Sequence, residues 1–142
     1  MQFKSRKDPL YTSIVGAIIA FLFFSTFYFI LEGNNVTATI VTVVINAAVG
    51  FLLTWMLMGT SYIMNKEYLR YKAGPIKGKI ALDSIRQVKV GKTLYVGLKP
   101  ASARNGIVIY YNKYDEIYIS PESNSHFVEE LKKLNPSIEV LD

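Results

Sequence analysis

Two long apolar runs near the N-terminus constrain this chain more than any other feature. The first extends from Tyr11 to Leu31 and the second from Val36 to Met58, and neither contains an Asp, Glu, Lys or Arg. A helix needs about 20 apolar residues to cross the bilayer core. Because only residues 32–35 separate the runs, we predict a hairpin of two transmembrane helices, with spans at 11–31 and 36–58, occupying residues 1–60.

A cleaved signal peptide is the alternative interpretation of the first run, because basic residues precede it. The run is longer than the apolar segment of a signal peptide, which has about 7 to 15 residues, and a second span follows almost at once. The hairpin is therefore the favoured prediction.

Basic residues flank both spans and are absent from the loop between them. They are Lys4, Arg6, Lys7, Lys66, Arg70 and Lys72. Since Lys and Arg accumulate on the cytoplasmic side of membrane proteins, we expect a multi-pass protein of the cell membrane with both termini in the cytoplasm.

Asn46 lies near the middle of the second span, where an unpaired amide is costly. We expect it to face the first helix rather than lipid. The alternative is a polar element of a transport path, which would require several copies of the chain, because two helices cannot enclose a pore.

After Ser61 the pattern changes to short β-type runs separated by turn residues. The predicted strands are Ser61–Asn65, Tyr68–Ala73, Ile76–Ala81, Gln87–Val90, Thr93–Gly97, Gly106–Tyr111 and Glu116–Ser120. A C-terminal helix should follow, with Ser120 as its cap, Pro121 at its first position, and an apolar stripe that includes Phe127 and Leu131. We predict an all-β or α+β domain over residues 61–142: a curved antiparallel sheet of up to seven strands closed by this helix.

This outline is that of a pleckstrin-homology (PH)-like domain, and three segments make the resemblance specific. They are Tyr110–Pro121, Phe127–Leu131 and Asn135–Ile138. Together with the basic start Phe3–Asp8 and the two spans, the chain resembles a family of small bacterial PH-domain membrane proteins. The resemblance implies a PH-like fold on the cytoplasmic side. The segment Pro100–Gly106 departs from the family pattern.

Catalytic motifs are scarce. The chain has no cysteine and one histidine, His126, so thiolate chemistry is excluded and a histidine-based site would depend on that residue alone. The Gly91-Lys92-Thr93 triplet resembles the end of a P-loop, but Arg86 stands where that motif needs a glycine. We expect no enzyme, no catalytic residue, no cofactor or metal, and no nucleic-acid partner.

Charge is distributed unevenly over the predicted domain. Residues 66–104 contain ten Lys or Arg and two acids, whereas residues 105–142 contain three Lys and seven acids. The turn Gly74-Pro75 should pair Arg70 with Lys79 and Lys72 with Lys77 on one sheet face. These four are the candidate site for anionic lipid headgroups, and an ordinary solvated face is the alternative.

The functional hypothesis is a membrane-anchored, non-enzymatic binding module that contacts anionic lipid or a partner protein at the cytoplasmic surface. The alternative is an immunity protein that protects its host from a membrane-active peptide bacteriocin. The sequence leaves the ligand and the oligomeric state open.

Overall fold

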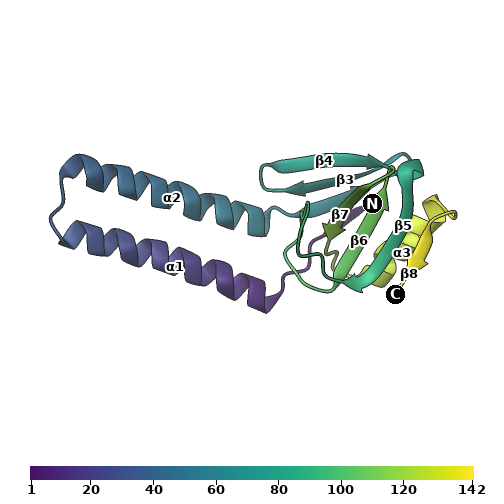
Figure 1. Cartoon of the computed structure of the whole chain (residues 1–142), viewed down its shortest axis with the longest axis horizontal. Helices are drawn as coiled ribbons and strands as arrows, with labels where there is room; N and C mark the ends of the chain where they lie inside the picture. The colour runs from purple at the N-terminus through teal and green to yellow at the C-terminus, as the bar shows by residue number, and fades with distance from the viewer.

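The computed structural model describes all of residues 1–142 and places two long helices at one end of a β-rich domain (Figure 1). In chain order the elements are β1 (Gln2–Lys4), α1 (Pro9–Leu31), α2 (Val36–Met58), β2 (Ser61–Met64), β3 (Tyr68–Ala73), β4 (Ile76–Ala81), the 3₁₀ turn η1 (Leu82–Ser84), β5 (Ile85–Lys92), β6 (Gly106–Tyr111), β7 (Asp115–Ile119), α3 (Asn124–Leu134) and β8 (Glu139–Leu141).

Helices α1 and α2 are long and apolar enough to cross a membrane, and they indicate a membrane location for the chain. Asp8 caps α1 by accepting a hydrogen bond from the Leu10 amide at 2.9 Å, and Asn35 caps α2 in the same way at the Thr37 amide. Val15 is the only buried residue of the pair. Apolar surfaces this exposed suit contact with lipid rather than water.

The two helices meet at a polar cluster in the middle of the spans. Asn46 Nδ2 donates to Thr26 Oγ1 at 2.7 Å and lies 3.3 Å from both the Leu22 carbonyl and Ser25 Oγ. This confirms that Asn46 faces the first helix.

The domain consists of two four-stranded sheets, ordered β1-β2-β3-β4 and β7-β6-β5-β8, with β8 parallel to β5 and every other pair antiparallel. Helix α3 packs its apolar side into the core that the sheets enclose, and Phe127 and Leu131 are fully buried. The predicted curved sheet with a C-terminal helix is confirmed, although the strands number eight and divide between two sheets.

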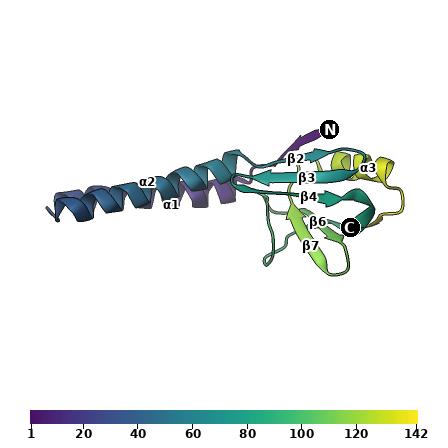
Figure 2. The ribbon, with the colours of Figure 1, turned by 90° about the horizontal axis from the view of Figure 1, so that it is seen from above.

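Strand β1 places the start of the chain inside the domain. It pairs with β2 so that Phe3 lies opposite Tyr62. The helical hairpin is therefore inserted between two adjacent strands of one sheet, as Figure 2 shows from above. Phe3, which belongs to the predicted N-terminal segment 1–60, lies in the core of the domain.

Two predictions about individual elements were wrong. Thr93–Gly97 forms no strand and belongs to the β5–β6 loop. Helix α3 is capped by Ser123 rather than Ser120, because Ser120 is fully buried and bonded to Ser5, while Pro121 bridges to the strand segment at Ser5.

Candidate functional site

The β3–β4 hairpin has the predicted register. Arg70 lies opposite Lys79 and Lys72 opposite Lys77, so two pairs of like charges stand on the outer face of the sheet. All four side chains are exposed. The ion pairs of the chain lie elsewhere, between Arg104 and Asp8 and around Lys133, so the repulsion within this face is not relieved by carboxylates.

The opposite face of the hairpin holds it on the domain core. Leu69 and Ile80 are paired and buried, and Tyr71 packs over Gly78, where any Cβ would collide with the tyrosine ring. Ile76, which pairs with the buried Ala73 at the end of the hairpin, is 40% exposed. The end of the hairpin extends beyond the core, so no partner covers this side chain.

That extended end lies against the last turn of α2. Gly74 at the tip has a φ of +58°, and a Cβ there would lie 2.9 Å from the Met56 side chain. Trp55 and Pro75 line a hollow of about 470 Å³ beside the basic face. Figures 1 and 2 both show the hairpin running back along the direction of the helices to the end of α2. The basic face therefore begins where the span ends.

A buried polar cluster connects segments that are distant in sequence. The Tyr62 hydroxyl donates to the Pro100 carbonyl at 2.6 Å and accepts from the Ser120 amide at 3.1 Å, while Ser5 Oγ and Ser120 Oγ are 2.9 Å apart. Burial raises the pKa of Tyr62, so the hydroxyl stays protonated. The sequence alone does not reveal this cluster, because only the folded sheet brings its members together.

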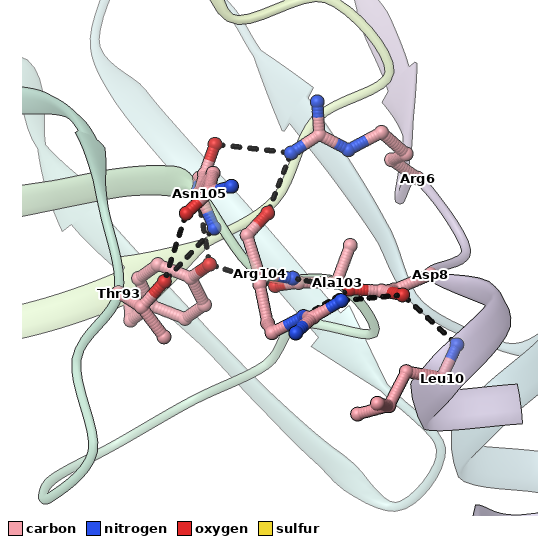
Figure 3. Close-up of polar contacts among 9 residues, drawn as sticks. Arg6, Asp8, Leu10, Thr93, Ala103, Arg104 and Asn105 are labelled. Carbon is pink, nitrogen blue, oxygen red and sulfur yellow. Dashed lines mark hydrogen bonds and ion pairs between the residues drawn. The ribbon is translucent and has the colours of Figure 1, made fainter.

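Two arginines attach the β5–β6 loop to the start of α1 (Figure 3). Arg104 Nε lies 2.7 Å from Asp8 Oδ2, and Arg6 Nη2 donates to the carbonyls of Arg104 and Asn105 at 2.6 and 3.0 Å. The Arg104 guanidinium and the Leu10 amide together lower the pKa of Asp8. The segment that departs from the family pattern therefore has a local role in positioning α1.

His126 and Asp115, two side chains that could act as acid or base, belong to different elements, α3 and β7. His126 is exposed and packs its ring 5.5 Å from the ring of Phe3. Asp115 accepts a hydrogen bond from Asn112 within the β6–β7 turn. No group of three His, Cys, Asp or Glu side chains could hold a metal ion. What the structure offers for recognition is a charged surface.

Comparison with protein families identifies the domain. A family model described as a bacterial PH domain matches residues 60–135, which is more than half of the chain. Comparisons with curated proteins and with solved structures found no match. PH domains are generally non-catalytic binding modules for lipids or proteins, and the eight strands and final helix are consistent with that fold. The chain belongs to the bacterial PH domain family.

Proposed function

We propose that this protein is a membrane-anchored, non-enzymatic binding module. Its hairpin spans the cell membrane with both termini in the cytoplasm, and its PH domain contacts anionic lipid headgroups through Arg70, Lys72, Lys77 and Lys79. The immunity hypothesis has no support in the fold or in the family match and is not retained.

The basic residues that flank both spans support the cytoplasmic orientation. The strand pairing is consistent with it, because β1 precedes α1, β2 follows α2, and the two strands are neighbours in one sheet. The first residue of α1 and the last residue of α2 must therefore lie on the same side of the bilayer as the domain.

The observation that carries the proposal is that basic residues lie directly opposite each other at two positions on the outer face of β3–β4. Like charges directly opposite each other destabilise a sheet. An anionic bilayer surface would neutralise them, at about 1 kcal/mol for each basic residue close to the surface.

The attraction should be graded along the hairpin. Lys72 and Lys77 lie near the tip beside α2, and Arg70 and Lys79 lie two residues farther away, which is about 7 Å at the rise of a β-strand. Since the Debye length is about 8 to 10 Å at physiological salt, the nearer pair should contribute more.

Trp55, the only tryptophan of the chain, lines the hollow beside this face and provides the test. The full-length protein is placed in nanodiscs that contain brominated phosphatidylglycerol or brominated phosphatidylcholine in the same proportion. Accumulation of anionic lipid should make bromophosphatidylglycerol the stronger quencher of Trp55, and added salt should reduce the difference.

Three variants sharpen this experiment. Changing all four basic residues to Ser should abolish the preference. The double variant K72S/K77S should lose more of it than R70S/K79S, which removes the same charge from the same strands. Equal quenching by both lipids in the parent would overturn the lipid proposal and leave the face to a protein partner.

A further inference from the structure

A hollow with a volume of about 750 Å³ lies where the N-terminal segment passes the end of α2. We call it the junction cavity. The pairing of the strands explains its floor, because Lys4 lies opposite Ser61 on β2, and Ser61 lies opposite Lys72 on β3. These three residues form one row across three adjacent strands and share a face of the sheet.

The small side chain of Ser61 leaves a gap between two lysines. Neighbouring strands are about 4.8 Å apart, so the backbones of Lys4 and Lys72 are separated by about 10 Å with only a hydroxymethyl group between them. Two long ammonium side chains on either side of such a gap can both reach one phosphate group placed over Ser61.

The charge of the cavity lining is strongly positive. Four basic residues, Lys4, Arg6, Lys7 and Lys72, line it against one acid, Glu122. The three lysines have no ion-pair partner in the chain. Arg6 is oriented by hydrogen bonds to the Arg104 and Asn105 carbonyls, which fixes one wall of the cavity.

Part of the lining is apolar and belongs to the end of α2. Leu57 and Met58, the last two residues of α2, line the cavity, and Met58 is 68% exposed. Cations that adjoin the apolar end of a transmembrane helix match a molecule with a charged head and a hydrocarbon tail. Basic pockets at this level of a membrane protein suit anionic lipid headgroups.

We propose that the junction cavity binds the phosphate of one anionic phospholipid, held over Ser61 between Lys4 and Lys72 with Lys7 at the rim, while the acyl chains lie along α2. The inference rests on the proposed function in one respect, namely that the domain lies against an anionic bilayer. It differs by assigning a single, defined lipid site instead of a diffuse attraction.

The test measures lipid retained by the full-length protein in detergent, by native mass spectrometry during titration with phosphatidylglycerol or phosphatidylcholine. The parent should retain one phosphatidylglycerol molecule and bind phosphatidylcholine at least about tenfold more weakly. The variant S61L fills the gap without changing the charge and should lose the bound lipid. The variant K4S/K7S should weaken binding by about tenfold or more, since two charges are removed.

The control variant is K113S/K132S, which removes two exposed lysines from the β6–β7 turn and α3 and should bind as the parent does. Thermal unfolding of each variant verifies that the domain is folded. If S61L fails to fold, K4S/K7S still decides the result, because Lys4 and Lys7 are exposed. Parent-like binding by K4S/K7S would overturn the proposal.

A further arm adds inorganic phosphate as a competitor. Phosphate at millimolar concentration should leave the lipid bound, and its displacement would show a site for free phosphate instead. The two proposals fail separately: absence of a retained lipid alongside preferential Trp55 quenching defeats only the junction cavity. Retention without preferential quenching defeats only the diffuse contact with the β3–β4 face.

Discussion

The helical hairpin and the PH domain are stabilised by different means. The domain has a core of fifteen buried side chains drawn from both sheets, α3 and the connections beside them, whereas α1 and α2 share one polar cluster and bury almost nothing else. In lipid, apolar side chains gain little by packing on each other. The hairpin therefore depends on its own length and hydropathy, and the domain on contacts between distant segments.

The largest expected effect is in the domain core. Leu131 is fully buried on the inner side of α3, so Leu131→Ala should lower the free energy of unfolding by about 2 to 5 kcal/mol. Chemical denaturation of the purified protein, followed by a signal from the sheets, measures this change. Lys132→Ala, on the exposed side of the same turn, should stay within about 0.5 kcal/mol of the parent. Equal effects of the two substitutions would mean that α3 does not contribute to the core.

The second effect tests the link between the two regions. Phe3 is 9% exposed and packs its ring 5.1 Å from that of Phe127. Phe3→Ala should destabilise the domain by about 3 kcal/mol, the lower end of the usual range for this substitution, because a short edge strand can relax into the space. Gln2→Ala, at the exposed neighbouring position, is the control. If Phe3→Ala unfolds like the parent, the N-terminal strand is not an integral part of the domain.

A related comparison uses two soluble fragments. One contains residues 61–142, and the other adds residues 1–8 through a flexible linker that replaces the hairpin. The second should be the more stable, because it restores β1 and the hydrogen bonds from Ser5 to the Ser120 region. Equal stability of the two fragments would mean that the residues before α1 do not stabilise the domain.

These contacts also show which features the sequence reveals. The two long apolar helices and the β3–β4 register were predicted correctly, because hydropathy, strand alternation and a two-residue turn at Gly74-Pro75 are local properties. Strands β1 and β8 have three residues each, too few for an alternating pattern, and they exist because a distant strand pairs with them. The same reason explains the error at Ser120, whose residue type suits a helix cap but whose partners, Ser5 and Tyr62, lie far away in sequence.

The two candidate binding surfaces also differ in how far the sequence predicts them. The four cations of the β3–β4 face were identified from alternation alone. The junction cavity was not, since it needs Lys4 of β1 beside Ser61 of β2, two residues separated by both spans. The loop between Lys99 and Asn105 had no predicted role for the same reason, because its partners Asp8 and Tyr62 precede it by many residues.

A smaller effect is expected inside the membrane. Asn46→Leu removes the hydrogen bonds to Thr26, Ser25 and the Leu22 carbonyl. Interhelical hydrogen bonds of this kind contribute about 0.6 kcal/mol on average and at most about 1.7. Unfolding in detergent mixtures, monitored at the hairpin, should show that the free energy of unfolding falls by an amount in that range. The stability of the PH domain should be unaffected. If Asn46→Leu lowered the free energy of unfolding as much as Leu131→Ala does, the hairpin and the domain would not differ in how they are stabilised.

The smallest effect concerns the ion pair between Asp8 and Arg104, at the boundary between the hairpin and the domain. The Arg104 guanidinium lowers the pKa of Asp8 below its ordinary value of 3.8, so the folded protein favours the carboxylate. The resulting stabilisation is present above pH 3.8 and is lost as the pH falls through the lower pKa of the folded state. The side chain of Arg104 is 56% exposed, and solvent screening keeps the contribution small.

Arg104→Ser should therefore be slightly less stable than the parent near neutral pH, and the two should converge as the pH falls from about 6 to about 2. Thermal unfolding across this range at low ionic strength measures the convergence, and Arg104→Lys should retain part of the difference because it keeps the charge. A difference between parent and Arg104→Ser that does not change with pH would show that the arginine acts by packing and not through Asp8. In that case the attachment of the β5–β6 loop to α1 would depend on the hydrogen bonds of Arg6 and on the buried Ser5–Tyr62–Ser120 cluster.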